Sequence, residues 1–188
     1  MSSADGGEGR NPGQSGIVSP FVHVWSRHVL DSIQLLSHIE SSAKRLLDFG
    51  SGAGFPGVVL GIAGAERGLG VWLVESNARK AAFLRTVVRE LSPGIQVLHG
   101  RMETVQWGRQ APPEYVTARA VAELAKLLEW SEWALKLGAT CLFPKGRTVE
   151  RELESVRRRE NYQWDLLPSD TDREGRIVRV RLRPGVGS

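Results

Sequence analysis

Short apolar runs that alternate with helical stretches are the feature that most limits how this chain can fold. The runs RLLDF (45–49) and VWLVE (71–75) each carry an acidic residue at or beside their end. Turn residues and then a stretch with the helical period follow each of them. The runs IQVLH (95–99), EYVTA (114–118) and TCLFP (140–144) predict three more strands. Repeated strand-helix units predict a parallel sheet with helices on both of its faces.

The C-terminal part of the sequence departs from this alternation. Only PSDTDREG (168–175) separates the runs YQWDLL (162–167) and RIVRVRLR (176–183), so these two strands can only pair antiparallel. We therefore expect an α/β fold of five strand-helix units with a mostly parallel seven-stranded sheet and a C-terminal antiparallel hairpin. Helices are predicted within 21–40, 78–91, 123–136 and 148–160, the first with an apolar stripe of Val29, Ile33, Leu36 and Ile39.

Length and composition predict one globular domain. The 188 residues and 41% hydrophobic content suffice for one sizeable core. Residues 1–20 are rich in Gly, Ser and Pro, so we expect a flexible tail at 1–20 and the folded domain at 21–188. The N-terminal residues lack the apolar core of a secretory signal, and no run of about 18 apolar residues follows. With Cys141 as the only cysteine, these features predict a cytoplasmic protein without membrane contact.

The segment DFGSGAGFPG (48–57) places four glycines within eight positions after the first strand. The last three of them spell the G-x-G-x-x-G pattern of dinucleotide-binding loops, and Glu75 follows about 20 residues later. Ligands of parallel sheets bind at the carboxyl ends of the strands, which is where Asp48, the glycines and Glu75 fall. Two nucleoside ligands, a dinucleotide and S-adenosylmethionine, therefore have to be compared.

The position of Asp48 favours S-adenosylmethionine. A carboxylate at the mouth of the first strand would repel a pyrophosphate, by kcal/mol rather than tenths in a partly dry site. S-adenosylmethionine carries an ammonium, a carboxylate and a sulfonium but no phosphate. Asp48 can hold the ammonium directly or through water, while loop amides suit the carboxylate. Glu75, which ends the second strand, can accept hydrogen bonds from ribose hydroxyls. These features predict a Rossmann-like class I methyltransferase that uses S-adenosylmethionine.

Six segments spread in order over some 120 residues make a more specific pattern. They are RHVLDS (27–32), DFGSGAGFPG (48–57), ESNARKAAFLR (75–85), GRME (100–103), ARAVAEL (118–124) and FPKG (143–146). In this combination they resemble the bacterial glucose-inhibited division protein B family. The resemblance implies methyl transfer to N7 of a guanine in 16S (small-subunit) ribosomal RNA, with the RNA or the 30S particle as partner. We expect the protein to be a monomer. The net charge of +4 fits a polyanionic partner.

The resemblance also implies roles for single residues. Met102 with Glu103 resembles the pair that encloses the adenine, and Arg119 matches an arginine at the cofactor or substrate edge. The residues expected at the cofactor are Asp48, Gly50, Gly52, Phe55, Glu75, Met102, Glu103 and Arg119. Those expected to contact RNA phosphates or the base are Arg27, His28 and Lys145. Arg119 and Lys145 are the candidates for a direct part in the transfer.

For the implied reaction, the protein mainly has to position the guanine relative to the methyl group of the cofactor. Guanine N7 has an exposed lone pair, so it can attack a sulfonium methyl without losing a proton, and no general base is required. Cys141 lies in an apolar strand, which argues against a cysteine nucleophile, and the four histidines lack the spacing of a metal site. Two alternatives stay open: a methyltransferase with the same cofactor that acts on a small molecule or protein, and a non-catalytic RNA-binding relative.

Overall fold

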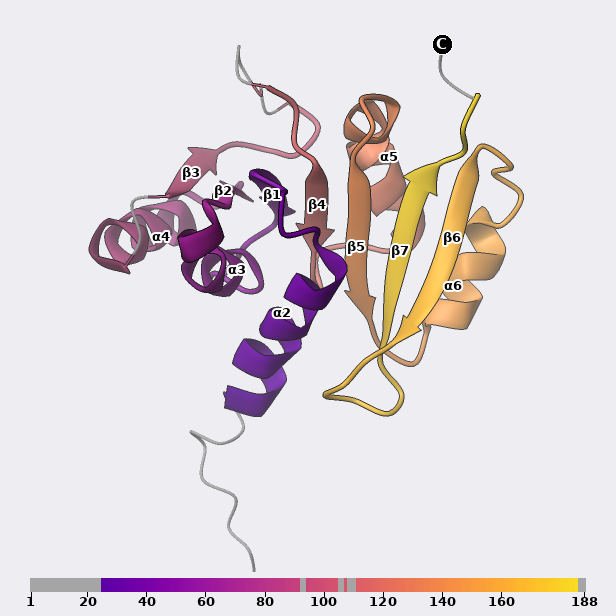
Figure 1. Cartoon of the computed structure of the whole chain (residues 1–188), viewed down its shortest axis with the longest axis horizontal. Helices are drawn as coiled ribbons and strands as arrows, with labels where there is room; N and C mark the ends of the chain where they lie inside the picture. Colours follow the sequence, from indigo (N-terminus) through magenta and orange to yellow (C-terminus); the bar gives the residue numbers. More distant parts are fainter. Residues whose placement is uncertain (1–24, 92–93, 105–106, 108–110, 186–188) are drawn as a thin grey trace, which may run out of the picture.

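A seven-stranded sheet forms the centre of the fold in the computed structural model, which describes residues 25–91, 94–104, 107 and 111–185. The strand order is β3-β2-β1-β4-β5-β7-β6 (Figure 1). β7 pairs antiparallel with both β5 and β6, and the other pairs are parallel. The strands are β1 (Arg45–Phe49), β2 (Gly70–Glu75), β3 (Ile95–His99), β4 (Tyr115–Ala118), β5 (Thr140–Lys145), β6 (Tyr162–Pro168) and β7 (Arg176–Leu182). The predicted mixed sheet with a C-terminal antiparallel hairpin is confirmed.

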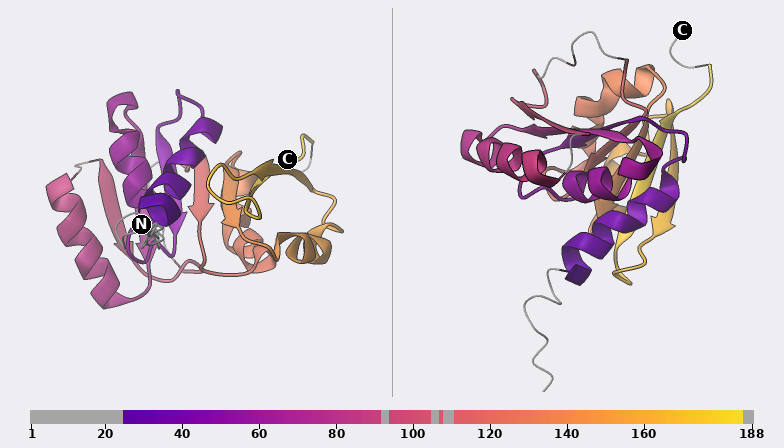
Figure 2. Two further views of the ribbon diagram at one scale, coloured as in Figure 1. Left: turned by 90° about the horizontal axis from the view of Figure 1, so that it is seen from below. Right: turned by 60° about the vertical axis from the view of Figure 1, so that its left-hand side comes forward.

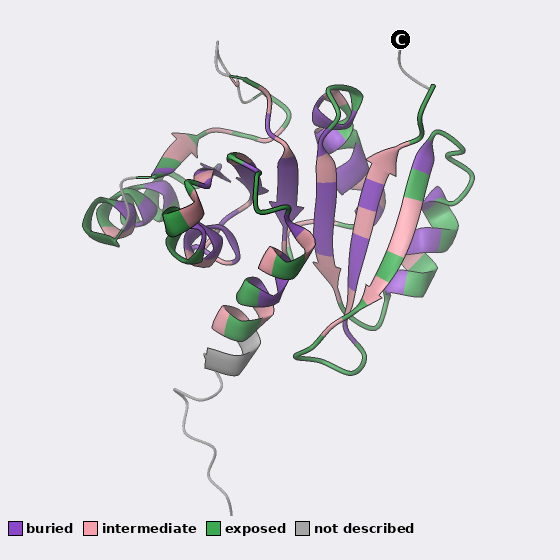
Figure 3. Cartoon of the chain, viewed as in Figure 1, coloured by how far each residue is buried: buried purple, intermediate pink, exposed green. Residues whose placement is uncertain are grey.

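Helices cover both faces of this sheet, and each face has its own apolar core (Figures 1 and 2). One core packs the sheet against the N-terminal helical segment, α3 and α4, and the other packs it against α5 and α6. Figure 3 shows that buried residues fill the central strands. Among the described helices, none combines the length and apolar character needed to cross a membrane. The helical elements are η1 (Trp25–Leu30), α2 (Asp31–Ile33), η2 (Gln34–His38), α3 (Gly57–Ala63), η3 (Ala65–Arg67), α4 (Ala78–Leu91), α5 (Leu124–Lys136) and α6 (Val149–Val156).

The N-terminal helical segment differs from its prediction. It winds as a π-helix, then a short α-helix, then a 3-10 helix, and it ends at His38. Each change of winding rotates the side chains relative to a regular 3.6-residue period. The predicted stripe is therefore wrong at Ile33, which is 37% exposed, whereas Leu35 is fully buried. Residues 21–24 of this predicted helix, like the predicted tail at 1–20, lie outside the described residues.

Two further predictions fail for local reasons. The helix predicted at 148–160 ends at Val156, because the three arginines that follow offer no apolar side chain to the core. The unit after β3 has no helix in the residues described between it and β4, where Pro112 and Pro113 disfavour helical backbone. The remaining strand-helix units are present.

The parallel register brings the residues singled out in the sequence to one edge of the sheet. Asp48 of β1 lies opposite Leu73 of β2 on one side and Thr117 of β4 on the other. Glu75 is the last residue of β2, and Arg119 directly follows β4. Because β1, β2 and β4 run in the same direction, their carboxyl ends meet there, where parallel α/β sheets bind ligands.

Candidate functional site

The glycine-rich loop after β1 closes tightly over the end of the strand. The amides of Gly50 and Ser51 both donate to the carbonyl of Val74 in β2, at 2.9 and 3.2 Å. Gly50 has a φ of +63°, and a Cβ there would lie 2.3 Å from Cγ2 of Val121. Any side chain at position 50 would therefore be strained and would collide with the wall formed by the segment after β4.

Asp48 lies beneath this loop and is completely buried. Its Oδ1 accepts a hydrogen bond from the Thr117 hydroxyl at 2.7 Å, and its Oδ2 accepts one from the Gly57 amide at 3.3 Å, at the start of α3. A Cβ at Gly57 would come within 2.7 Å of the same Oδ2, so only glycine leaves room for the carboxyl. Burial raises the pKa of Asp48 to about 6, although the hydrogen bonds from Thr117 and Gly57 oppose that rise.

Glu75 at the end of β2 joins the loop to the start of α4. Its side chain is almost buried, with 5% exposed. One carboxylate oxygen accepts the Gly52 amide at 2.9 Å, and the other accepts the Asn77 amide at 2.7 Å. Each oxygen keeps a second lone pair, so a ligand hydroxyl can still donate to the carboxylate. Asn77 in turn caps α4 by accepting the amides of Arg79 and Lys80.

A cavity of about 660 Å³ opens above these residues. It is lined by His28, Gly50, Ser51, Gly52, Ala53, Phe55, Glu75, Ser76, Asn77, Lys80, Met102, Arg119, Ala120 and Val121. The structure thus brings together Gly50, Gly52, Phe55, Glu75, Met102 and Arg119 of the predicted cofactor residues. Two others do not line this cavity, since Asp48 lies under the loop and Glu103 is exposed beside it. Of the predicted RNA residues His28 lines it, and the side chain of Arg27 lies outside the described part of the chain.

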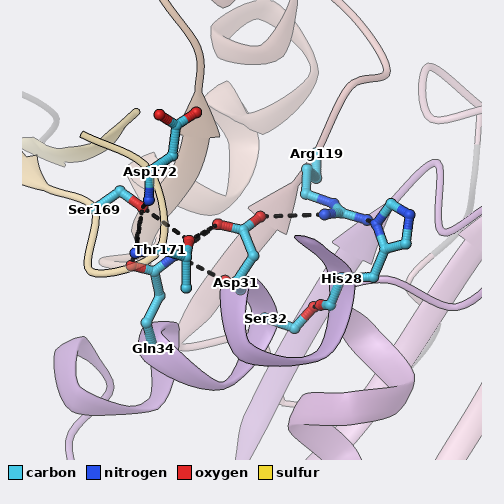
Figure 4. Close-up of polar contacts among 8 residues, drawn as sticks. All are labelled: His28, Asp31, Ser32, Gln34, Arg119, Ser169, Thr171 and Asp172. Atoms are coloured by element: carbon cyan, nitrogen blue, oxygen red, sulfur yellow. Dashed lines mark hydrogen bonds and ion pairs between the residues drawn. The ribbon is translucent and has the colours of Figure 1, made fainter. Parts of the chain in front are cut away.

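Arg119 is held at the rim of this cavity by three side chains. Its Nη1 donates to Oδ2 of Asp31 at 3.1 Å, and its Nη2 donates to Nδ1 of His28 at 2.8 Å (Figure 4). The guanidinium lies 5.6 Å from the centre of the Phe55 ring, and that ring stacks on His28 at 5.1 Å. The next residue, Ala120, has a φ of +53°, a conformation that non-glycine residues adopt mainly where the fold imposes it. A guanidinium can only donate, so Nδ1 of His28 is the acceptor in this contact.

A second cavity of about 570 Å³ lies on the other side of Arg119. Residues 119–121 line both cavities, while Asp31 and Lys145 line only the second. Lys145 Nζ pairs with Glu152 at 2.7 Å and donates to the Ala122 carbonyl at 2.8 Å. Burial acts to raise the pKa of Glu152, but hydrogen bonds from Lys145 and the Leu124 amide hold that pKa below its ordinary value. Lys145 is thus held at the second cavity as an ion-paired group.

The described side chains favour binding and orientation over covalent chemistry. Burial raises the pKa of the Cys141 thiol to about 12, so the thiolate needed for nucleophilic attack does not form near neutral pH. Within the described ranges, His, Cys, Asp and Glu side chains form no group of three that could hold a metal ion. Asp31 is the functional candidate that the sequence patterns missed. Its place in RHVLDS (27–32), one of the six segments that carry the family resemblance, is the signal that could have found it.

Solved S-adenosylmethionine-dependent methyltransferases share this fold. One from Aquifex aeolicus has a TM-score of 0.66 at 13% identity, over 88% of this chain and 94% of that chain. The magnesium protoporphyrin IX methyltransferase of Synechocystis, solved with bound S-adenosylmethionine, has a TM-score of 0.62 at 14% identity. That match covers 91% of this chain and 86% of the Synechocystis chain. The predicted Rossmann-like methyltransferase fold is confirmed.

Sequence comparison narrows the family. The family model for rRNA small subunit methyltransferase G matches residues 18–166. The ribosomal RNA small subunit methyltransferase G of Methylobacterium radiotolerans is 50% identical over 157 residues, which cover 84% of this chain and 74% of the relative. The protein of the same name from Dinoroseobacter shibae is 38% identical over 164 residues, covering 86% and 83%. This chain therefore belongs to the rRNA small subunit methyltransferase G family, the family that its six segments resemble.

Proposed function

We propose that this chain transfers the methyl group of S-adenosylmethionine to N7 of a guanine in 16S (small-subunit) ribosomal RNA. The observation that carries the proposal is the cavity above the ends of β1 and β2, where a loop that admits no side chain at Gly50 meets the almost buried carboxylate of Glu75. The relatives' name supports ribosomal RNA as the acceptor. The choice of N7 rests on the family resemblance. The reaction belongs in the cytoplasm, where bacterial ribosomes are assembled.

The residues around the cavity fit S-adenosylmethionine better than a dinucleotide. With a pKa of about 6, Asp48 is mostly ionised at neutral pH and adds negative charge beneath the loop, which disfavours a diphosphate. Glu75 is fixed by two backbone amides and offers its remaining lone pairs to ribose hydroxyls. When bound, S-adenosylmethionine supplies a methyl group on a sulfonium, which is electrophilic. The contribution of Asp48 is then to favour a ligand that carries an ammonium group.

The second cavity, where we place the methyl acceptor, fits a base that does not need to lose a proton. His28 uses Nδ1 to accept from Arg119, so that nitrogen does not serve as a proton acceptor for the substrate. Arg119 and Lys145 bring positive charge to the wall between the cavities and to the second cavity, where they can contact RNA phosphates or acceptor atoms of the base. Catalysis then comes from holding N7 in line with the methyl carbon and the sulfur.

Transfer of a radiolabelled methyl group tests this proposal. The full chain is incubated with labelled S-adenosylmethionine and with naked 16S ribosomal RNA, 30S particles or total lysate, and labelled RNA is digested to nucleosides. We expect the label in 7-methylguanosine from naked RNA or from 30S particles. Label found only in protein or metabolites would contradict the RNA assignment. Binding of the cofactor by calorimetry with no transfer to any acceptor would instead favour a non-catalytic relative.

The Glu75→Gln variant should bind S-adenosylmethionine about tenfold to hundredfold more weakly than the wild type. Glutamine has one acceptor oxygen, so its amide group would face either the Gly52 or the Asn77 amide and leave a buried donor unsatisfied. Calorimetry gives the dissociation constant. Glu114→Gln is the control for the same substitution away from the site, because Glu114 accepts the amides of Lys44 and Arg45 on a single oxygen and lines neither cavity. Equal dissociation constants for the two variants would remove Glu75 from the cofactor site.

A further inference from the structure

Asp31 connects Arg119 to a loop that the proposed function does not yet involve. One carboxylate oxygen, Oδ2, receives the guanidinium of Arg119. The other, Oδ1, accepts the Thr171 hydroxyl at 2.9 Å and the Gln34 amide group at 2.6 Å (Figure 4). Thr171 belongs to the loop between β6 and β7. The side chains of Thr171 and Asp31 therefore link the C-terminal hairpin to Arg119 at the cavity wall.

Gln34 fixes that loop to the N-terminal helical segment. It is 8% exposed, and its Oε1 accepts the Asp170 amide at 2.8 Å and the Ser169 hydroxyl at 3.3 Å. Its Nε2 donates to Thr171 at 3.2 Å as well as to Asp31. Every polar atom of the Gln34 amide is therefore used to hold the loop and the carboxylate together, and Asp31 has little freedom to change its orientation.

The ion pair itself is well shielded from solvent. The side chains of Arg119 and Asp31 are 18% and 19% exposed. A charge pair at this depth is screened much less than one at the surface, so the position of the carboxylate strongly affects where the guanidinium lies. Arg119 borders both cavities, whereas Asp31 borders only the second one, on the side away from the glycine loop.

We propose that Asp31 is a positioning residue for methyl transfer. Its carboxylate, which Gln34 and Thr171 fix, holds the Arg119 guanidinium at the boundary between the two cavities. This inference rests on the proposed function, because Arg119 acts there on the acceptor. It gives the loop 169–172 of the β6–β7 hairpin an indirect part in methyl transfer, through the contact of Thr171 with Asp31. The chemical partner of the positioned guanidinium is a phosphate or an acceptor atom of the RNA base.

Exposed Thr171 allows a test that spares the fold. Thr171→Val removes the hydroxyl at nearly constant size, and Thr171→Ser keeps it, so the second variant is the matched control. We expect Thr171→Val to lower kcat/KM for the RNA substrate several-fold and Asp31→Asn about tenfold, with Thr171→Ser close to wild type. The melting temperature and the dissociation constant for S-adenosylmethionine, both measured on the same variants, should change little for Thr171→Val.

A double-mutant cycle with Arg119→Ala separates positioning from a general loss of structure. If Asp31 acts through Arg119, adding Asp31→Asn to Arg119→Ala lowers kcat/KM no further. Losses that simply multiply, or a Thr171→Val variant with wild-type kcat/KM, would overturn the inference.

If the wild type transfers no methyl group to RNA, the proposed function is contradicted but the contact between Asp31 and Arg119 is not. An NMR measurement tests that contact without any methyl transfer. Long-range proton-nitrogen spectra report which imidazole nitrogen of His28 is protonated. The Nδ1 acceptor signal, which depends on Arg119, should change in Asp31→Asn. An unchanged signal would overturn the positioning role.

Discussion

Replacing Gly50 by alanine should weaken the binding of S-adenosylmethionine by about 30-fold or more. Two costs add at this position. A non-glycine residue with φ near +63° is strained by roughly 1–2 kcal/mol. The new Cβ would also lie 2.3 Å from Cγ2 and 2.9 Å from Cβ of Val121, and overpacking of that kind costs about 1–3 kcal/mol. To reduce the strain or the overlap, the glycine loop or the segment around Val121 has to move. Both line the cavity, so either movement changes its shape.

Calorimetry and thermal unfolding together check this expectation. Gly100→Ala is the control, because a Cβ at Gly100 meets no atom within 4 Å and its φ is not in the left-handed region. That variant should bind the cofactor like the wild type. Adding Val121→Ala to Gly50→Ala removes the shortest contact and should restore part of the affinity, while the backbone strain stays. A Gly50→Ala variant that binds as tightly as Gly100→Ala would show that the loop has no close ligand.

The strands and the ligand-binding edge could be predicted from sequence because they depend on local patterns. Runs such as RLLDF and VWLVE are apolar and bounded by turns, and parallel strands necessarily share their carboxyl edge. Asp48 shows the limit of such patterns. It shares a face of β1 with Leu46, which packs into the core on the α3 side, so its side chain points under the loop. The prediction of its direct contact with the cofactor stays a prediction.

Contacts between distant segments could not be predicted from the sequence. Asp31 meets Arg119 across 88 residues and Thr171 across 140. No periodicity links positions so far apart, and the irregular winding of η1, α2 and η2 removes the regular face on which Asp31 would be placed. Lys145 is held at the second cavity by the Ala122 carbonyl, 23 residues away in the sequence, as well as by nearby Glu152.

Asp48 should make the stability of the protein depend on pH between about 4 and 6. The pKa of its carboxyl is about 6 in the folded chain against 3.8 for an ordinary aspartate. Over this range the folded state binds a proton that the unfolded state has released, so the contribution to stability is present at low pH and is lost as the pH rises through 6. The full change is about 3 kcal/mol.

Urea unfolding of the wild type and of Asp48→Asn from pH 4 to pH 8 measures this change. Asparagine cannot titrate, but its amide group would face the donor of either Thr117 or Gly57, which adds a cost that does not depend on pH. The free energy of unfolding of Asp48→Asn, relative to wild type, should therefore rise by about 2 kcal/mol as the pH goes from 4 to 7. A difference that stays constant across this range would mean that Asp48 titrates normally.

The pH dependence of cofactor affinity shows whether the Asp48 carboxylate only supports the fold or also favours a ligand with an ammonium group. Ionised Asp48 is costly to bury, and an ammonium group in the cavity above would reduce that cost, so its pKa should fall on binding and a proton should be released near pH 5.5. The affinity of the wild type for S-adenosylmethionine should drop as the pH falls below 6, by at most tenfold per pH unit, whereas Asp48→Asn should bind weakly at every pH. The α-amino group of the cofactor stays protonated throughout this range, so it cannot cause the effect. Calorimetry in two buffers of different ionisation enthalpy gives the number of protons released, and a value of zero near pH 5.5 would leave Asp48 with a role in folding alone.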